Sequence, residues 1–574
     1  MGRIVGIDLG TTTSEIAYIN NGEPEVIKNG YSSITPSVVG LDKNYNVIVG
    51  EKAKDQILNA SDRTVVEVKR KMGTNDLVIL GGKKFTPTQI SSEILKELKR
   101  VGEQYLQEEI TEAVITVPAN FNDAQRQATK EAGEKAGLIV NQIINEPTAA
   151  ALAFGINNLG TEGNVLVYDI GGGTFDVTVL EMIEGSLDVR ASRGINRLGG
   201  KDFDEKIVEE IISALKSNYS FDLYNDVQGN EKLNILGRIK AEAEKTKIAL
   251  SSIQVVDIQL PFLAQKDGEI INFEMEISRS RFDELISDYV SQTMDTVNEA
   301  LQAAKLTAAD IDIVLPIGGS SRVPAIYENL KNIFGNKIRG KVNPDEAVAL
   351  GAAVQAGINK NEIVGNNSIA IFDVCNHSLG TEVVRDTANG YKDGFYDRLI
   401  LRDTHLPFSR TNRYNTTSDY QESVIVGIYQ GEDNLVENNI KLGELEVNGI
   451  PANKAGEECV DVTFKYNING ILEVSVIVVS TGKEASTTIN MFNYDAPKTK
   501  SEEKIDDFMS GAWTQASEIQ TTVMLYKSRR SNLPEEAQKQ ADALIKKLKE
   551  AVINNDYDKM DYYDDNLTAL LFEY

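Results

Sequence analysis

The 574-residue sequence contains only two cysteines, Cys375 and Cys459, and only two histidines, His377 and His405. Two thiols in a chain of this length do not form a disulfide framework, which favours a reducing compartment. A zinc site of the usual kind needs several Cys or His ligands, and the neighbourhood of Cys375 and His377 offers no second pair. No Gly-x-Ser-x-Gly elbow stands near either histidine, which argues against a serine-type catalytic triad.

The sequence also lacks long apolar runs and a surplus of basic residues. Its most apolar stretch, 474–479, is much shorter than the roughly 20 residues of a membrane-spanning helix, and residues 1–8 show no signal-peptide pattern. With 59 Lys and Arg against 86 Asp and Glu, the net charge of -27 disfavours nucleic acid as a partner. We attribute the acidity to solubility. We expect a cytoplasmic monomer that binds neither nucleic acid nor membrane.

The pattern of apolar residues changes along the chain and predicts several domains, in keeping with roughly 150 residues per domain. Short β-branched runs alternate with helical patterns first, which is typical of α/β architecture. After a polar connector come strands and turns, including an Asn469-Gly470 pair that favours a type I′ hairpin. The end is helical, with Pro534 at a helix start. These four segments span residues 1–364, 365–373, 374–496 and 497–574.

Two turns of small residues each follow an apolar strand that ends in aspartate, Asp8-Leu9-Gly10-Thr11-Thr12 and Asp169-Ile170-Gly171-Gly172-Gly173-Thr174. Backbone N–H groups hold phosphate oxygens well, and glycine lets the backbone approach them without a Cβ in the way. The threonine hydroxyls add donors, and the aspartates suit hydrated Mg²⁺, which takes few carboxylate ligands. A single such turn is common, but two copies indicate duplicated lobes that face one phosphate chain.

A third loop of small residues, Ile317-Gly318-Gly319-Ser320-Ser321-Arg322, follows another apolar strand, and no Walker A motif competes with the three loops. With further motifs, they resemble the seventy-kilodalton heat-shock chaperone family of the bacterial DnaK type, within the actin and sugar-kinase superfamily. The resemblance is dense over residues 1–357, looser up to 496 and faint beyond. The further motifs are Val68-Lys69-Arg70, Thr116-Val117-Pro118-Ala119-Asn120-Phe121, Ile144-Asn145-Glu146-Pro147-Thr148-Ala149-Ala150-Ala151, Phe175-Asp176, Leu198-Gly199-Gly200-Lys201-Asp202-Phe203-Asp204 and Val342-Asn343-Pro344-Asp345-Glu346-Ala347-Val348-Ala349.

The resemblance implies a multidomain fold and a nucleotide site that uses ATP or ADP with Mg²⁺. The fold would be an α/β, actin-like, two-lobed ATPase domain, then an all-β sandwich that binds peptide, then a short α-helical lid. Lys69 would offset charge that develops at the γ-phosphate, while Glu146 and Asp176 would order the attacking water. The catalytic residues so implied are Lys69, Glu146, Asp169, Thr174 and Asp176. Those that hold Mg²⁺ through water are Asp8 and Asp169.

The resemblance also implies which residues contact the nucleotide. Glu244, Lys247 and Ser251 lie on one helix face and would hold the adenosine, although Glu244 and Lys247 alone would indicate only a solvated ion pair. The full set of implied nucleotide-binding residues is Asp8, Gly10, Thr11, Thr12, Thr13, Gly171, Gly172, Gly173, Gly199, Gly200, Glu244, Lys247, Ser251, Gly318, Gly319, Ser320, Arg322 and Asp345.

The peptide-binding half departs more from the family. The implied pocket residues are Thr381, Val384, Tyr414, Thr417, Val424 and Val426. Alternation puts Val424 and Val426 on one strand face, which by itself indicates a core position. Thr381 replaces an aliphatic residue, and about eight extra residues precede Leu406, judged by alignment to the family. Lys201 stands where the family has an acid, the linker apolar run is altered, and the lid is short with no acidic tail.

The resemblance thus implies an ATP-dependent chaperone that binds unfolded or extended polypeptide, with a J-domain co-chaperone and a nucleotide-exchange factor as partners. ATP and peptide binding would oppose each other, because coupling between two sites is reciprocal. Two alternatives remain open at this point. One is a cytoskeletal or sugar-kinase relative that uses the same cleft. The other is a specialised or degenerate paralogue that clamps one dedicated partner.

Overall fold

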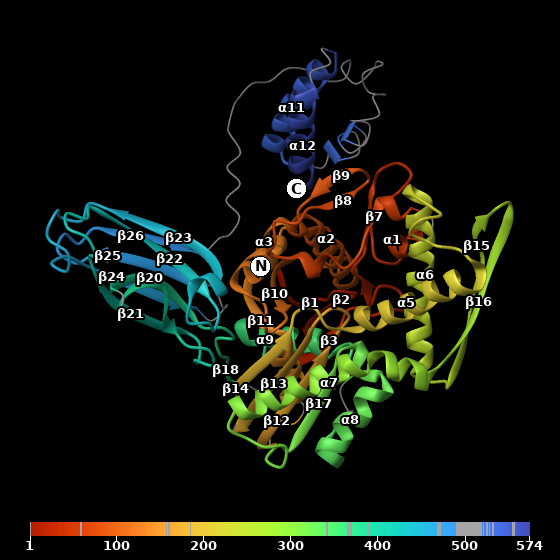
Figure 1. Ribbon diagram of the computed structural model, residues 1–574, viewed down its shortest axis with the longest axis horizontal. Helices are drawn as coiled ribbons and strands as arrows, with labels where there is room; N and C mark the ends of the chain where they lie inside the picture. The colour runs from red at the N-terminus through yellow and green to blue at the C-terminus, as the bar shows by residue number, and fades with distance from the viewer. Residues whose placement is uncertain are drawn as a thin grey trace.

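The computed structural model shows a mixed α/β fold with several sheets (Figure 1). Its N-terminal sheets and helices occupy the centre, a purely β part lies to one side, and the C-terminal helices lie above the centre (Figure 1). The structure describes residues 2–57, 60–156, 158, 161–183, 185–339, 343–363, 370–387, 390–467, 472–488, 519, 522–523, 526, 529–530, 533–553 and 557–573.

The first sheet has the strand order β11 (Ile139–Asn145), β10 (Ile110–Val117), β1 (Arg3–Leu9), β2 (Thr13–Asn20) and β3 (Glu23–Val26), with β4 (Thr35–Pro36) paired to β2. β1 is parallel to β10, which is parallel to β11, whereas β1 and β2 form an antiparallel hairpin. Most residues of β1 and β10 are buried, because helices cover both faces of the sheet. These helices are α2 (Pro87–Leu106), α3 (Asp123–Lys135), α4 (Glu146–Ile156) and α9 (Ala347–Asn359).

The second sheet repeats this plan. Its order is β17 (Ile313–Ile317), β12 (Gly163–Ile170), β13 (Phe175–Ile183), β14 (Ser186–Ile195) and β18 (Ala370–Phe372). β12 is parallel to β17 and forms a hairpin with β13, as β1 does with β10 and β2. α4 and α9 share one apolar core with strands of both sheets. The predicted duplication is therefore present in the sheets. On the other face of the second sheet lie α5 (Gly200–Tyr219), α7 (Arg279–Ala303) and α8 (Pro324–Phe334).

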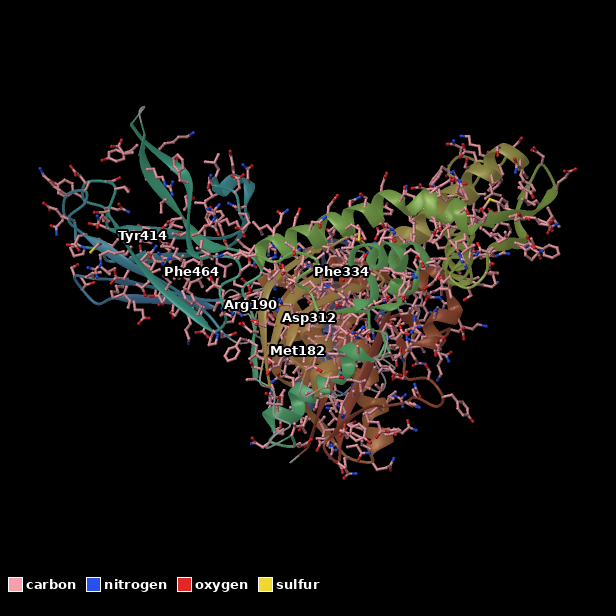
Figure 2. The ribbon with its side chains drawn as sticks, turned by 90° about the horizontal axis from the view of Figure 1, so that it is seen from below. Met182, Arg190, Asp312, Phe334, Tyr414 and Phe464 are labelled. Carbon is pink, nitrogen blue, oxygen red and sulfur yellow. The ribbon has the colours of Figure 1, made fainter. Side chains whose placement is uncertain are left out.

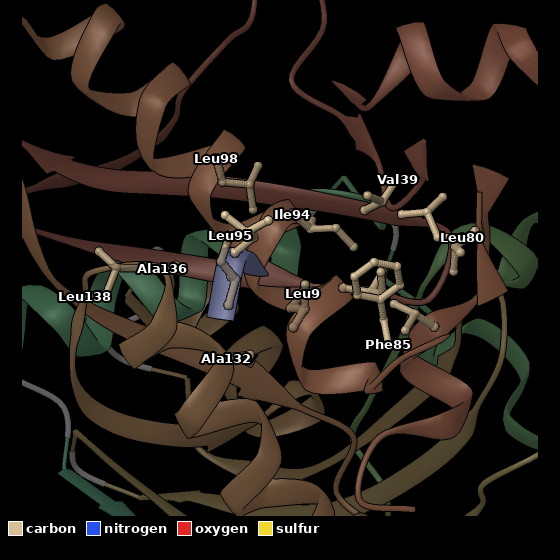
Figure 3. Close-up of a cluster of buried hydrophobic side chains, with 14 of the residues drawn as sticks. Leu9, Val39, Leu80, Phe85, Ile94, Leu95, Leu98, Ala132, Ala136 and Leu138 are labelled. Carbon is tan, nitrogen blue, oxygen red and sulfur yellow. The ribbon is translucent and has the colours of Figure 1, made fainter. Parts of the chain in front are cut away.

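Two peripheral groups of elements flank the sheets. One consists of α6 (Gly229–Leu250) and the long hairpin of β15 (Val255–Lys266) and β16 (Glu269–Ser278). It lies on the opposite side of the sheets from the purely β part of the chain, which we call the β-domain (Figure 1). The other contains η2 (Val68–Lys71), which carries Lys69, and packs around the core drawn in Figure 3, where Phe85 and Leu80 meet Ile94 of α2. Its remaining elements are β5 (Val39–Leu41), β6 (Val47–Val49), α1 (Glu51–Gln56), η1 (Ser61–Arg63), β7 (Thr64–Val65), β8 (Val78–Leu80) and β9 (Lys83–Phe85).

The β-domain consists of two four-stranded antiparallel sheets whose inner faces share one core. Alternate residues of each strand face inward, as in Leu472–Val478 of β25, and Phe464 and Tyr414 point between the sheets (Figure 2). One sheet contains β20 (Gly390–Ile400), β19 (Leu379–Thr387), β22 (Ser423–Gln430) and β23 (Ile440–Asn448). The other contains β21 (Phe408–Asn415), β24 (Cys459–Tyr466), β25 (Leu472–Val478) and β26 (Glu484–Thr488). The Asn469-Gly470 turn itself lies outside the described residues, although β24 and β25 do pair antiparallel.

The C-terminal helices α11 (Glu535–Ile553) and α12 (Tyr557–Glu573) pack against the N-terminal part of the chain. α11 begins directly after Pro534, as predicted. Lys83 of β9 forms a buried ion pair with Asp564 of α12, and Glu93 of α2 accepts from Arg529 at 2.7 Å. Most of the predicted linker and the beginning of the predicted lid lie outside the described residues.

Candidate nucleotide site

The two glycine-threonine turns lie face to face. A Cβ on Gly172 would stand 1.9 Å from the Thr12 Oγ1, and a Cβ on Gly173 would stand 2.7 Å from Thr11. Only glycine allows the turns to approach this closely, because real Cβ atoms do not fit at such distances. The two copies found in the sequence therefore form one cradle of small residues, which we call the phosphate cradle.

One lysine and four carboxylates surround the phosphate cradle: Lys69, Asp8, Glu146, Asp169 and Asp176. The Lys69 Nζ lies 2.5 Å from the Glu146 Oε1, and the lysine is only 4% exposed. The Thr116 hydroxyl donates to the Asp8 Oδ1 at 2.9 Å. The Asn120 backbone N–H donates to the Asp176 Oδ1 at 3.0 Å. Neighbouring strand ends and the start of α4 thus hold these groups in fixed orientations.

Crowding raises the pKa values of the three aspartates in this group. Burial, followed by the charge of Glu146, raises the pKa of Asp8 to about 7 and that of Asp176 to about 7. Burial and the neighbouring carboxylates raise the pKa of Asp169 well above its ordinary value, and its Oδ2 has no hydrogen-bond partner within the described chain. One ammonium does not balance four buried carboxyl groups. The donor set fits a hydrated divalent cation, which prefers carboxylate oxygens and water.

The start of α5 lies directly under the second turn of the cradle. The backbone N–H groups of Gly200 and Lys201 donate to its carbonyls at 3.0 and 2.8 Å. The Lys247 Nζ of α6 contacts the Gly200 carbonyl at 3.1 Å and the Asp204 Oδ1 at 2.8 Å. On the same face of α6, Ser251 donates to the Lys247 carbonyl at 3.4 Å. The predicted adenosine-holding face of α6 is thus joined to the phosphate cradle.

The third loop closes the site from the other side. Ser320 donates to the Gly171 carbonyl at 2.9 Å, and Arg322 pairs with Asp345 at 2.7 Å. Gly318 has φ 76°, a conformation that favours glycine. The predicted nucleotide-binding residues therefore converge on one connected region. Of the remaining ones, Gly10 lies on the first turn, Thr13 starts β2, Gly199 precedes α5, Glu244 lies on α6 and Gly319 lies on the third loop, while the predicted catalytic Thr174 lies on the second turn.

Two further residues of the site carry no role in the sequence-based prediction. The Arg70 Nη2 donates to the Asp202 Oδ2 at 2.5 Å and to the Gly173 carbonyl at 3.3 Å, and so connects η2 with α5 across the cradle. Glu15 is paired with Asp8 across β1 and β2, and burial followed by Asp8 raises its pKa to about 10. Arg70 could have been predicted, because it belongs to the motif that contains Lys69. Glu15 lies in a strand without any motif, so nothing in the sequence indicates a role for it.

The segment between the predicted domains joins the second sheet next to this site. β18 pairs in parallel with β14, Ala370 opposite Ser186. The Asp373 Oδ2 accepts from the Asn145 Nδ2 at 2.8 Å and from the Thr148 hydroxyl at 3.3 Å. Asn145 and Thr148 flank Glu146 in the sequence, so the connector contacts the same helix start that carries a predicted catalytic group.

The β-domain rests directly on the nucleotide-binding part of the chain. Polar side chains form much of this interface, and both histidines of the protein lie in it. Its hydrogen bonds and ion pairs include Tyr466 to Asp123 at 2.7 Å, His377 to the Asn120 carbonyl at 3.2 Å, Arg193 to Asp403 at 2.9 Å and His405 to Asp188 at 2.7 Å. The Asn120 that meets His377 is the residue whose N–H binds Asp176, so the interface touches the site.

The six predicted peptide-binding residues lie on both sheets of the β-domain. Thr381 is buried and donates to the Gly427 carbonyl at 2.7 Å, and Val426 belongs to the core. Val424 is half-buried against that core, on the same strand face as Val426. The Tyr414 hydroxyl donates to Asp397 on the other sheet. Val384 and Thr417 are exposed.

Comparison with known proteins distinguishes the chaperone family from the cytoskeletal and sugar-kinase relatives that use a similar nucleotide site. The profile of the family described as Hsp70 protein matches residues 4–80 and 75–571. The chaperone protein DnaK of Thermotoga petrophila and that of Thermotoga maritima are each 40% identical to this chain over 584 aligned positions, which cover 98% of this chain and 95% of each relative. The chain belongs to the Hsp70 family. The chaperone protein DnaK of Thermotoga neapolitana matches to the same extent.

Membership of the Hsp70 family confirms the chaperone prediction. The chain is an Hsp70-type, ATP-dependent chaperone with ATPase activity. The cytoskeletal and sugar-kinase alternative is thereby set aside. In the described part of the chain, no helix has the length and apolar character needed to cross a membrane.

Proposed function

We propose that this Hsp70 chain binds exposed apolar segments of unfolded proteins in its β-domain and changes its affinity for them through ATP hydrolysis and exchange. The phosphate cradle carries this proposal, because two facing glycine-threonine turns ringed by buried acids and Lys69 suit a Mg²⁺-nucleotide. The domains we assign are an actin-like ATPase domain, a linker, a β-sandwich and a shortened helical lid, at residues 1–364, 365–373, 374–496 and 497–574.

The residues of the cradle divide the work of phosphoryl transfer. Its backbone N–H groups bind the phosphates, and Lys69 places a positive charge where negative charge grows at the γ-phosphate. Glu146, held 2.5 Å from Lys69, orients the attacking water with Asp176 and can take its proton. Thr174 adds a hydroxyl at the second turn. Asp8 and Asp169 would hold Mg²⁺ through water, and the ion would supply positive charge to offset that of the nucleotide phosphates.

The contacts next to the cradle offer a physical route between ATP and peptide. Asp373 accepts hydrogen bonds from Asn145 and Thr148, one residue before and two residues after Glu146. His377 contacts the carbonyl of Asn120, whose N–H donates to Asp176. A movement of Glu146 therefore alters the contacts of the linker, and a movement of Asp176 alters the contacts of the β-domain. If a nucleotide binds more tightly to this docked arrangement, and a peptide binds more tightly to the separated one, the nucleotide lowers the affinity for the peptide.

On the peptide side we assign the pocket to the six predicted residues. Thr381 and Val426 are buried here, so the β-domain must rearrange locally before an aliphatic peptide side chain can enter between its strands. We assign unfolded or extended polypeptide, a J-domain co-chaperone and a nucleotide-exchange factor as partners, and the cytoplasm as location. The monomeric state also remains part of this proposal.

Single-turnover ATP hydrolysis with and without a short apolar peptide tests the proposal. Peptide is expected to accelerate hydrolysis, and ATP is expected to speed peptide release. Hydrolysis that ignores peptide would favour the specialised or degenerate paralogue instead. A matched control uses a peptide of the same length in which each apolar residue is replaced by serine, and this peptide should leave the rate unchanged.

A further inference from the structure

Lys201, which stands where the family has an acid, lies between the phosphate cradle and α6. It is the second residue of α5, and its backbone N–H donates to the Gly172 carbonyl of the cradle at 2.8 Å. Its Nζ lies 3.3 Å from the Glu244 Oε2 of α6 and 3.4 Å from the Asp204 Oδ2. One residue thus contacts the phosphate-binding turn with its backbone and the predicted adenosine-binding helix with its side chain.

The side chain of Lys201 completes a chain of alternating charges. Asp204 lies between Lys201 and Lys247, and Glu244 closes the series on the far side of Lys201. Burial lowers the pKa of Lys201, but Glu244 and Asp204 outweigh this effect and leave that pKa above its ordinary value. The pKa of Glu244 is lowered although burial opposes this, with Lys201 as the leading favourable cause. Both groups of the contact between Lys201 and Glu244 are therefore charged.

We propose that Lys201 is a positioning residue that ties the phosphate cradle to α6 and thereby slows nucleotide release. The proposal rests on the nucleotide site described above. α6 cannot move away from α5 with a bound adenosine unless the contact between Lys201 and Glu244 breaks. Removal of the ammonium also makes the charge next to the cradle more negative by one, and this added negative charge disfavours bound phosphate.

Release of a fluorescent ADP analogue from the full-length chain measures this role. Lys201→Gln is expected to speed release about five- to tenfold, the size of effect that one partly buried ion pair supports. The single-turnover rate with bound ATP should stay within about twofold, because Lys201 does not contact the acids around Lys69. Lys201→Arg should restore slow release. Lys245→Gln serves as the matched control, because Lys245 is a largely exposed lysine of α6 that pairs with Glu242.

Three results would overturn the proposal: unchanged release from Lys201→Gln, equal acceleration by Lys245→Gln, or additive effects of Lys201→Gln and Glu244→Gln, since a shared contact requires non-additivity. If Lys201→Gln does not fold, Lys201→Glu, which carries the acidic residue of the family, must speed release at least as much, because it places a like charge beside Glu244. Failure of the wild-type chain to bind the ADP analogue would contradict the nucleotide site itself, which separates the two proposals.

Discussion

The interface between the β-domain and the ATPase part contains a buried aspartate and a partly buried histidine whose pKa values shift in opposite directions. Burial raises the pKa of Asp123, which accepts from Tyr466, to about 6. Burial lowers the pKa of His377 to about 4, and its Nε2 must carry a hydrogen because it faces the Asn120 carbonyl. Arg126, Arg402 and Glu432 also act on His377, and Arg126 acts on Asp123, in the same docked arrangement.

The two shifts have opposite consequences for docking as the pH falls. Docking takes up a proton at Asp123, so acid favours the docked arrangement between its ordinary pKa of 3.8 and about 6. Docking expels a proton from His377, so acid opposes docking between its ordinary pKa of 6.5 and about 4. From pH 7 to pH 5 these values make docking about tenfold stronger through Asp123 and about 20-fold weaker through His377. In the wild-type chain the two effects nearly cancel.

Single substitutions should therefore separate these two pH dependences, which oppose each other in the wild-type chain. Between pH 7 and pH 5, the docking equilibrium constant of Asp123→Asn should fall about tenfold relative to that of the wild type. That of His377→Gln should rise about 20-fold relative to the wild type. Energy transfer between dyes on azido side chains at the exposed positions Tyr31 and Tyr391, with ATP present, reports the docked fraction. The comparison with wild type removes the contribution of other groups. Two variants that follow the wild-type profile, or shift in the same direction, would refute this reasoning.

Three further outcomes follow from the site and the C-terminal helices. Lys69→Gln should still bind ATP but should slow single-turnover hydrolysis by about 10²- to 10³-fold. A fall in the hydrolysis rate of less than about tenfold would contradict the charge-stabilising role of Lys69. Gly172→Ala should lower nucleotide affinity in calorimetry far more than Gly171→Ala, because only the former Cβ collides with the facing turn. Asp564→Asn removes the buried carboxylate that pairs with Lys83 and should destabilise the packing of α12 by about 3–5 kcal/mol, seen as faster hydrogen exchange throughout α11 and α12.

The phosphate cradle could be predicted from the sequence because its chemistry is local. A strand that ends in aspartate and runs into glycine and threonine encodes both the backbone donors and the close approach, and the second copy at Asp169 supplies the partner. The alternation of strands and helices can likewise be predicted from the spacing of the apolar residues and from the length of each apolar run. The helix start at Pro534 and the antiparallel pairing of β24 with β25 agree with the patterns that predicted them.

The rest depends on contacts between distant segments, which leave no periodic signal. Arg70 meets Asp202 after 132 residues, and Tyr466 meets Asp123 after 343. Nothing in the apolar stripe of α11 indicates that the C-terminal helices pack on β9 and α2. The strand pattern that suggested a core role for Val426 was informative, since it lies in the core of the β-domain in this arrangement.

The short strand β18 also protects a sheet edge. While it pairs with β14, the backbone groups of Ser186 to Asp188 are covered. When the connector leaves, these N–H and C=O groups become a free template on which a strand of another molecule can pair. Asp188 and Arg190, which are charged and lie along β14, oppose such pairing, and Arg190 is labelled in Figure 2. Self-association of the protein should therefore depend on the position of its connector, and neutralising these two side chains should make the separated form aggregate.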